Sequence, residues 1–444
     1  MFKKCKTISK IRRIDMLSIT KLLFTASLVS VLAGLTACER LPNASSHANL
    51  DKVASKQPLT DDAELPTATT IIDCAQLAPQ QTFKVKGYSA LSKGCDLTGQ
   101  SIRFELNDSH SSLDCQGAAL SMMVQDQSKA SAITIKPKTD SAIEDIAVAN
   151  CHVDGYGHAL HIRQYSNPNQ RYVRGFIEPA ANRALAPRNI RVINVSSRNS
   201  INSGMFVGDH VHGVTFDKVS IQNAGTVGLY LEFGSRDNVI KNSVFVGNGF
   251  RTFKPNREAI AVDSSSNNLI ENNQFIHNGA GGVLLYRNCF EHADDATLGN
   301  HFKRTESSRN NIIRNNIFQD EPVGIWVASR QSRNLKGFEC GAYLVKQTLL
   351  ASYHLDSAKD NQIIGNRFKQ VEQGIIVEDD GTLISGNQFA ADVNQPISIG
   401  SEIREESAAG AIKNTLITDN YFTDKTIEQA VKVREASKTA TEIR

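Results

Sequence analysis

The chain has 444 residues, of which 40% are hydrophobic and 21% are charged, so it can bury a sizeable core and is not disordered throughout. The formal net charge of +3 is misleading, because residues 1–37 contain seven Lys or Arg side chains and one acid, and the rest of the chain has 42 basic and 45 acidic side chains. A net charge of −3 on that remainder gives no global electrostatic case for nucleic-acid binding, and we expect no nucleic-acid partner.

The N-terminus has the pattern of an export signal. A basic flank that ends at Lys21 precedes an apolar stretch over 22–37, which is short for a membrane-spanning helix. The stretch runs into Leu-Thr-Ala followed by Cys38, which resembles a bacterial lipobox. The resemblance implies that residues 1–37 are a signal peptide, with Met16 as an alternative start, and that Cys38 carries two acyl chains that anchor it stably to a membrane.

The residue after the lipid-bearing cysteine indicates which membrane. Glu39 stands where an Asp often signals retention in the inner membrane, so we expect the bacterial outer membrane. Residues 38–66 are rich in Ser, Asn, Ala and Pro and lack apolar periodicity. We therefore expect them to form a flexible tether between the lipid and a folded domain.

Six cysteines remain beyond the lipobox, at positions 74, 95, 115, 151, 289 and 340. An even number in an exported chain suggests disulfides, and six cysteines allow fifteen pairings. There is no Cys-x-x-Cys pair, which argues against a zinc site.

From about residue 67 the sequence repeats a short unit of the form Ile-x-x-Asn-x-Phe. The copies begin at Ile240 (with Ser in place of Asn), Ile270, Ile313, Ile363, Ile384 and Ile417, and degenerate copies begin at Val148 and Val214. A second short strand of the form Gly-apolar-x-apolar accompanies them at Gly228, Gly282, Gly324 and Gly374. Units this short with insertions between them indicate a β-solenoid, in which the repeated Asn would stack into an amide ladder.

These repeats resemble the right-handed parallel β-helix proteins of the pectate-lyase-like superfamily. The resemblance implies an all-β, single-stranded solenoid of roughly nine to eleven coils over residues 67–425, with a cap at each end. Residues 71–115 would form the first cap, and residues 426–444 a C-terminal cap or tail with a short helix. Cys74–Cys95 would then pair within the first cap, and Cys115–Cys151 would pair between neighbouring coils.

Alternation along the second strand predicts a column of outward side chains from coil to coil. That column is His161, Phe206, Tyr230, Ala261, Leu284, Trp326 and Ile376. A second column at the strand ends is Arg163, Gly208, Glu232, Asp263, Tyr286, Ala328 and Glu378, and the turn that follows adds Arg236, Arg287 and Arg330. Acids, tyrosine and arginines side by side are typical of a saccharide-binding groove. The alternative is that these side chains form a structural ladder of salt bridges between coils.

Two large insertions, 286–308 and 330–360, leave the same strand end in consecutive coils. We expect them to form a wall or lid over the central coils, where functional loops tend to lie. Cys289 and Cys340 lie in these two insertions, so a Cys289–Cys340 disulfide could join them.

Related β-helix enzymes act on acidic polysaccharides by β-elimination, epimerisation or hydrolysis, so the resemblance implies an acidic polysaccharide or another cell-envelope glycan as the partner. We predict Tyr286, Arg287, Glu232 and Asp263 as catalytic residues and Arg236, Arg330, Tyr230 and Trp326 as substrate-binding residues. An arginine could bind the uronate carboxylate bidentately, and Tyr286 could transfer a proton. Glu232 and Asp263 are candidate Ca²⁺ ligands, and we expect no other cofactor.

A lyase is favoured because the Asp pair of the hydrolases is missing from the central strands and the Asp-Pro-His-Asp signature of the epimerases is missing from the sequence. The alternative is a non-catalytic, monomeric surface protein that binds saccharide or serves as a structural scaffold.

Overall fold

The computed structural model describes residues 65, 67–126, 128–164, 183–251, 254–287, 289, 306–338 and 343–444. Of the two units into which the chain divides, Met1–Asn49 and Leu50–Arg444, only the second contains described residues. The signal peptide, Met16, Cys38 and nearly all of the tether lie outside the described residues, so only the second unit is described below.

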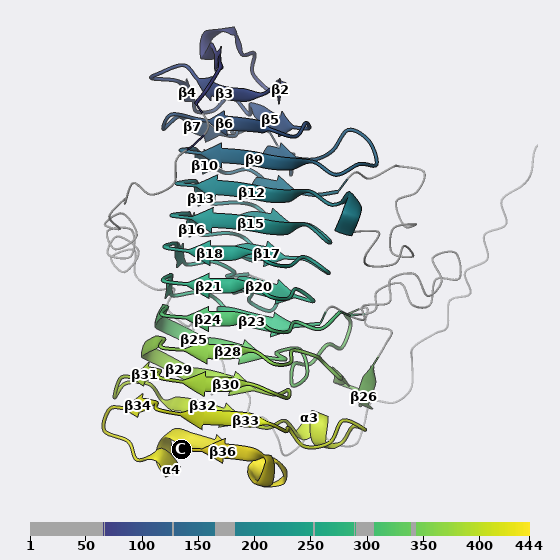
Figure 1. The fold of residues 1–444 in the computed structure, drawn as a ribbon, viewed down its shortest axis with the longest axis vertical. Coiled ribbons are helices and arrows are strands. Elements are labelled where there is room, and N and C mark those ends of the chain that lie inside the picture. Colours follow the sequence, from purple (N-terminus) through teal and green to yellow (C-terminus); the bar gives the residue numbers. More distant parts are fainter. Residues whose placement is uncertain are drawn as a thin grey trace, which may run out of the picture. The chain divides into compact units, whose positions relative to one another are not determined.

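The second unit is a stack of parallel β-strands in which each coil contributes one strand to each of three series (Figure 1). The first series is a parallel sheet of 13 strands: β1 (Thr70–Ile72), β3 (Tyr88–Leu91), β6 (Ser111–Asp114), β9 (Glu144–Ala149), β12 (Arg188–Ile193), β15 (His212–Asp217), β18 (Val239–Lys241), β21 (Leu269–Glu271), β24 (Ile312–Arg314), β28 (Gln362–Ile364), β30 (Leu383–Ser385), β33 (Thr415–Thr418) and β36 (Thr441–Ile443).

The other two series together form a sheet of 21 strands. The second series is β4 (Asp96–Leu97), β7 (Ala119–Ser121), β10 (His152–Asp154), β13 (Ser196–Arg198), β16 (Ser220–Gln222), β19 (Val244–Val246), β22 (Gln274–Ile276), β25 (Ile317–Val327), β29 (Arg367–Val377), β31 (Gln388–Phe389) and β34 (Tyr421–Phe422). The third series is β2 (Thr82–Val85), β5 (Arg103–Leu106), β8 (Ser131–Ile135), β11 (His158–Ile162), β14 (Met205–Val207), β17 (Leu229–Leu231), β20 (Glu258–Asp263), β23 (Gly281–Tyr286), the ends of β25 and β29, β32 (Gln395–Ile399) and β35 (Val431–Val433).

The repeated unit sets the register and fills the core. The isoleucines of the first series pair in order from Ile240 to Ile417. The phenylalanines two residues after each Asn stack face to face from Phe245 to Phe422, with ring centroids 4.7–5.2 Å apart. Glycine is required at three positions of the second repeat, because a Cβ on Gly282, Gly324 or Gly374 would lie 2.5–2.7 Å from the phenylalanine ring of the next coil.

The asparagines form the predicted amide ladder. The Asn273 side chain donates to Asn316, Asn316 to Asn366 and Asn366 to Asn387 at 3.0 Å, and each carbonyl also accepts the backbone N–H of the preceding ladder residue. A second ladder, which the sequence analysis did not identify, runs through Asn238, Asn268, Asn311 and Asn361. These bonds satisfy polar groups that the stacked turns bury.

The structure corrects the sequence-based alignment at one repeat. The degenerate copy that was expected to begin at Val214 begins at Phe216, because Phe216 is the residue that pairs with Ile240. Both side chains are buried on the same face, so a period-two pattern could not distinguish the two registers.

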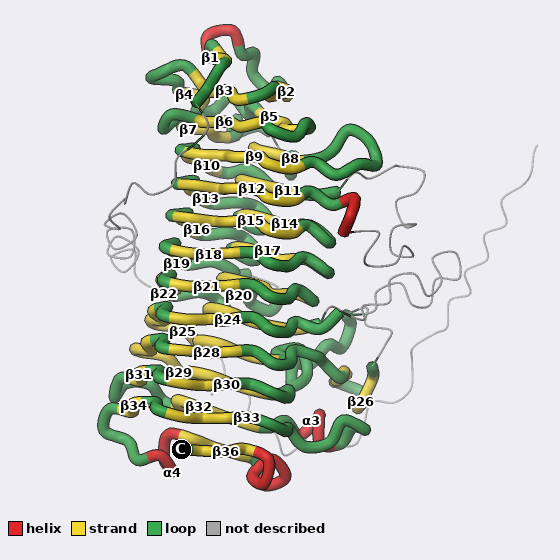
Figure 2. The backbone as a smooth tube through the Cα atoms, in the orientation of Figure 1, coloured by secondary structure: helices red, strands yellow, loops and turns green. Residues whose placement is uncertain are grey.

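The ends of the stack also differ in detail from the prediction. The eleven strands of the second series mark eleven complete coils, within the predicted number, and β1 and β36 add a partial coil at each end. Strands β1, β3 and β6 lie in the segment expected to be a cap, and β36 lies in the C-terminal tail. The helical segments are short: 3-10 helix η1 (Cys74–Gln76) at one end, α4 (Ile427–Ala430) and η5 (Glu435–Ala440) at the other, and α3 (Glu402–Glu405) beside the insertion (Figure 2).

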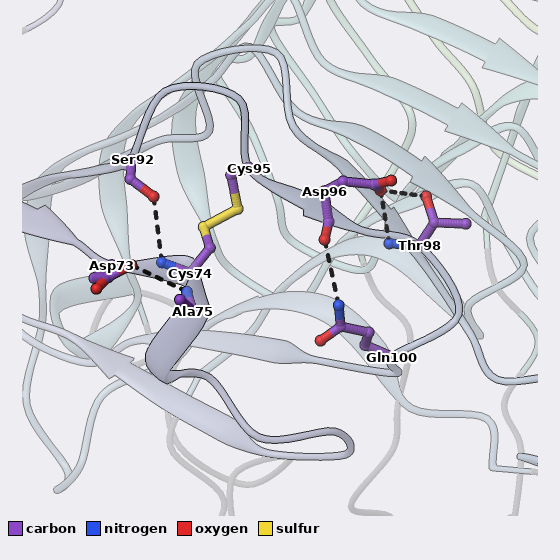
Figure 3. The surroundings of a disulfide bond; sticks show 8 residues. All are labelled: Asp73, Cys74, Ala75, Ser92, Cys95, Asp96, Thr98 and Gln100. Atoms are coloured by element: carbon purple, nitrogen blue, oxygen red, sulfur yellow. Dashed lines mark hydrogen bonds between the residues drawn. A yellow bond between two sulfur atoms is a disulfide. The ribbon is translucent and has the colours of Figure 1, made fainter.

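Two disulfides have the pairings favoured from the sequence, Cys74–Cys95 and Cys115–Cys151. Figure 3 shows the first of them, where the Cys74 backbone N–H also donates to Ser92. Cys289 is disulfide-bonded, and its predicted partner Cys340 lies outside the described residues.

Candidate functional site

The outward column of the third series has the predicted register. His161 pairs with Phe206, Phe206 with Tyr230, and the pairing continues through Ala261, Leu284, Trp326 and Ile376. Asp263 and Tyr286 pair in the second column. Two parts of this face gather polar side chains: a buried cluster over β17, β20 and β23, and an open groove over β5, β8 and β11.

One half of the buried cluster is built around Tyr286, which is fully buried. Its hydroxyl donates to Glu258 Oε1 at 2.8 Å and accepts from the Arg257 guanidinium at 3.0 Å. Arg257 also donates to both Glu258 oxygens, at 3.1 and 3.2 Å. Burial alone would raise the pKa of Glu258, but the charge and hydrogen bonds of Arg257 lower it to about 2. Glu258 is therefore ionised, and its charge is neutralised by Arg257.

The other half joins Tyr230, Asp263 and Arg330. The Tyr230 hydroxyl donates to Asp263 Oδ2, and the Arg330 guanidinium lies 3.9 Å from the same oxygen. Arg330 also stacks over the Tyr286 ring at 4.3 Å, so it links the two halves. Burial raises the pKa of both tyrosines, and the neighbouring carboxylates Glu258 and Asp263 add to the rise, so both hydroxyls stay protonated.

The second insertion packs against this cluster and ends in an antiparallel hairpin, β26 (Leu344–Gln347) and β27 (Ser352–His354). Asp356 holds it in place by accepting the backbone N–H groups of Arg287 at 2.6 Å and Arg330 at 2.9 Å. The Arg287 guanidinium donates to the Leu355 carbonyl and lies 3.7 Å above the Tyr343 ring. Arg287 and Arg330 therefore attach the insertion to the sheet.

The remaining predicted site residues lie around the cluster or away from it. Trp326 packs against its apolar side, and the carboxylate of Glu232 accepts from the Phe233 backbone N–H and contributes to the raised pKa of Tyr230. Arg236 instead pairs with its neighbour Asp237 at 2.9 Å. The structure brings Tyr230, Asp263, Tyr286 and Arg330 together, while Arg236 is oriented elsewhere.

Sequence reasoning missed Arg257 and Glu258, which complete the cluster. Glu258 starts β20, five residues before Asp263, and pairs with Gly281, the residue before the second-strand motif of the next coil. The signal that could have identified it is an acid at the first position of an otherwise apolar strand, Glu-Ala-Ile-Ala-Val-Asp.

The open groove is a cavity of about 390 Å³ on the N-terminal half of the same face. Its charged lining residues are Arg103, Glu105, Lys129 and Arg163, of which Arg103 is paired with Asp126 at 3.0 Å and Arg163 is exposed. Because cations outnumber acids on its walls, the groove favours an anionic ligand.

Two histidines of β11 complete the groove. His158 Nδ1 lies 2.9 Å from the Ser203 carbonyl oxygen, and since a carbonyl only accepts, Nδ1 carries the proton and Nε2 carries a lone pair. Burial lowers the pKa of His158, and it lowers that of His161 to about 3, so both rings are neutral at pH 7. The His161 ring contacts Phe206, which stacks on Tyr230 at 5.0 Å, so aromatic rings connect the groove to the buried cluster.

A larger cavity of about 970 Å³ lies at the C-terminal coils, against β32, β35 and β36. Its lining includes three cations, Lys432, Arg434 and Lys438, and one acid, the exposed Glu428, but no histidine or tyrosine that could transfer a proton. Since Ser398 and Lys432 continue the same outward column, we assign the candidate site to the part of that column that carries histidines and tyrosines.

The described residues contain no group of three or more His, Cys, Asp or Glu side chains that could hold a metal ion. Asp263, a candidate Ca²⁺ ligand, already accepts a hydrogen bond from Tyr230 and lies beside the Arg330 cation. This donor set does not fit a cation site. In the same part of the chain, no helix is long and apolar enough to cross a membrane.

Two family models match the sequence. A model described as "Right handed beta helix region" matches residues 131–339, and one described as "Periplasmic copper-binding protein (NosD)" matches residues 296–438. The described residues of the second range offer no copper ligand cluster. No curated protein matches the chain significantly.

Solved structures resemble the chain at low sequence identity. They include Geobacillus virus E2 ORF18 (10% identity, 80% of this chain and 51% of that one, TM-score 0.34) and DFA-IIIase from Arthrobacter chlorophenolicus A6 (10%, 81% and 89%, 0.46). A mannuronic acid specific polysaccharide family 6 lyase from human gut microbiota also matches (11%, 84% and 84%, 0.40). The chain thus spans about half the length of the virus protein. Identities and scores this low carry no functional conclusion.

The family model for the β-helix region covers coils whose strands pair in parallel from β8 to β25, and the same pairing continues on both sides of that range. The chain is a right-handed parallel β-helix protein.

Proposed function

We propose that this protein acts on an acidic polysaccharide that lies along the outward face of the third strand series. The observation that carries this proposal is the cationic groove of about 390 Å³ over β5, β8 and β11. Its exposed Arg163 supplies a guanidinium that can pair bidentately with a uronate carboxylate. The aromatic rings of Phe206 and Tyr230 extend the face beyond the groove and suit the apolar side of a sugar ring.

The reaction we favour is β-elimination. It requires a cation beside the uronate carboxylate, a base for the C5 proton and a proton for the leaving oxygen. Arg163 meets the first requirement in the groove. The sequence-based prediction that Tyr286, Arg287, Glu232 and Asp263 are catalytic stays a prediction, and it requires the insertion that covers Tyr286 to move aside.

The runner-up function is a non-catalytic saccharide-binding or structural surface protein. One observation favours it: Glu258 pairs with Arg257 and Asp263 lies beside Arg330 in the buried cluster, as in a structural salt-bridge network. In that case the groove would bind the glycan without cleaving it.

We further propose that the protein is exported and anchored to the outer membrane through Cys38. The disulfides Cys74–Cys95 and Cys115–Cys151 support an oxidising compartment outside the cytosol. Metabolic labelling with palmitate would test the anchor. We expect label on the wild type and none on Cys38→Ala, and equal labelling of both proteins would contradict the proposal.

The enzymatic proposal is tested by incubating the purified protein with a panel of uronic-acid polysaccharides, with and without Ca²⁺. Unsaturated products absorb near 235 nm, and we expect an increase that Arg163→Ala strongly reduces. No absorbance and no new reducing ends on any polymer, together with measurable binding, would favour the runner-up. Loss of product with Tyr286→Phe but not with Arg163→Ala would place the reaction at the buried cluster.

A further inference from the structure

We infer that His158 is the catalytic base of this protein, which places proton abstraction in the open groove. The inference rests on the proposed function and deepens it, because it assigns a reacting atom that the sequence did not identify. Nε2 of His158 would take the C5 proton of a uronate residue whose carboxylate is held by Arg163.

The first support is the tautomer. The Ser203 carbonyl fixes the proton on Nδ1 of His158 at 2.9 Å, so Nε2 is the basic atom. Strand β11 has β14 as its neighbour in the next coil and β8 as its neighbour in the preceding coil. Ser203 lies just before β14, whereas the groove is lined by β5 and β8. The hydrogen bond therefore holds the ring by the edge that faces away from the groove. A ring oriented in this way does not need to reorganise before it accepts a proton.

The second support is the surrounding charge. His158 and His161 lie on β11 with ring centroids 5.2 Å apart, and Arg163 directly follows the strand. Lys129 and Ser131 line the groove near the start of β8, and Arg103 and Glu105 line it from β5. Burial keeps both rings neutral, and a bound carboxylate would raise the basicity of Nε2 as the proton is transferred.

The buried cluster offers no comparable base. Tyr286 is fully buried, its hydroxyl stays protonated, and Glu258 is paired with Arg257. A substrate atom can reach the groove in this structure but cannot reach those groups. This difference in access is why we prefer His158 to Tyr286.

The chemical step balances without a cofactor. Nε2 takes the proton from C5, and the electrons of the C5–H bond form the C4=C5 double bond. The C4–O4 bond breaks, and the leaving oxygen takes a proton from water, which reaches the open groove. The products are an unsaturated uronate and a new reducing end, and the imidazolium then returns its proton to solvent.

The test compares His158→Gln with His152→Gln. Glutamine is close to histidine in size and polarity, but its amide has no basic nitrogen, so the variant removes the base and leaves a polar side chain at position 158. His152 lies on β10 of the same coil, outside the groove, where Nδ1 meets the Ser196 hydroxyl at 2.9 Å, and it serves as the matched control. The readouts are kcat and KM from absorbance near 235 nm and Kd from calorimetry with a uronic-acid oligosaccharide.

We expect His158→Gln to lower kcat by about 100- to 1,000-fold, a size typical of a lost general base, with Kd within about threefold of the wild type. His152→Gln should match the wild type in both. Added imidazole should partly restore turnover to His158→Ala, which a merely structural role would not predict.

Two outcomes would overturn the inference in different ways. If the wild type forms product and His158→Gln retains a kcat within threefold, the base lies elsewhere, although the proposed function stands. If the wild type binds the oligosaccharide but forms no product from any polymer, the proposed reaction and this inference both fail, and only binding remains.

Discussion

The outward face holds two polar regions built on the same strand series, and they treat charge in opposite ways. In the buried cluster, Glu258 is paired with Arg257, Asp263 lies beside Arg330, and the tyrosine hydroxyls of this region donate to these acids. In the groove, Arg163 is exposed and the histidines are neutral because burial disfavours their charge. Charge is neutralised by partners in the first region and is available to a ligand in the second.

The difference teaches that the loop after a strand, and not the strand itself, determines whether an outward side chain is accessible to a ligand. The register of the column is the same from His161 to Trp326. Over β23 and β25, the insertion held by Asp356 closes the face, whereas over β5, β8 and β11 the face is hollowed. The predictions below separate these two roles, from the largest expected effect to the smallest.

Arg257→Ala should destabilise the protein most, because it leaves the ionised Glu258 buried without its cation. Loss of one partner from a buried pair costs about 3 to 5 kcal/mol. Scanning calorimetry should show a clear drop in Tm. Arg163→Ala, on the exposed side of the groove, should change stability by no more than about 0.5 kcal/mol.

The double variant Arg257→Met with Glu258→Gln provides the control, because it removes both charges and should recover much of the loss. If Arg257→Ala has no more effect on Tm than Arg163→Ala, the cluster does not serve as a structural network, and the contrast between the two regions is wrong.

Glu378→Gln extends the comparison to a later coil of the second column. Burial raises the folded-state pKa of Glu378 from 4.5 to about 8. Between pH 4.5 and 8, the folded protein keeps a proton on Glu378 that the unfolded chain has lost. The contribution of this group to stability is therefore fully present below about pH 4.5 and decreases as the pH rises to 8. Gln never ionises and removes that loss.

We expect Glu378→Gln to unfold at a higher temperature than the wild type at pH 8.5, by on the order of 2 kcal/mol in free energy, and to match it at about pH 4. Thermal unfolding at the two pH values measures this difference. Equal curves at pH 8.5 would show that Glu378 is ionised at no cost in the folded protein.

Asp356→Ala should release the insertion from the sheet. It removes the acceptor for the backbone N–H groups of Arg287 and Arg330, and unsatisfied buried donors cost about 1 to 3 kcal/mol. The effect should be local, so we expect faster proteolysis within 330–360 while the coils stay intact. Leu349→Ala is a suitable control in the same insertion, since the Leu349 side chain is 88% exposed. Equal cleavage rates for Asp356→Ala and the wild type would show that Asp356 does not hold the insertion.

The fold could be predicted from the sequence because its cause is local and repeated. Each Ile, Asn and Phe of the repeat contacts the same residue type in the next coil. A short sequence pattern therefore predicts the apolar core, the amide ladder and the strand register together. The prediction failed at Phe216, where the Asn is absent and two apolar residues share one face. It also missed the strands at both ends, where the repeat is lost.

The candidate site was less predictable because its cause is not local. Tyr230, Asp263 and Tyr286 were placed side by side from register alone, and the structure brings them together with Arg330. Their burial follows from contacts of the insertion, such as Asp356 with two backbone N–H groups, which no sequence period encodes. The groove was missed because His158 and Lys129 belong to no repeat.

Arg163→Ala should weaken the binding of an anionic oligosaccharide about tenfold, since one charge-assisted pair contributes about 1.5 kcal/mol in a partly exposed site. Calorimetry with a uronic-acid oligosaccharide measures it, and binding by the wild type should weaken as salt is raised because the pair is open to solvent. Arg236→Ala is the matched control: Arg236 is already paired with Asp237 and should leave Kd unchanged. If both variants bind like the wild type, the groove does not receive the carboxylate. If Arg236→Ala alone weakens binding, the ligand lies on the turn beyond Glu232, and the open groove has another role.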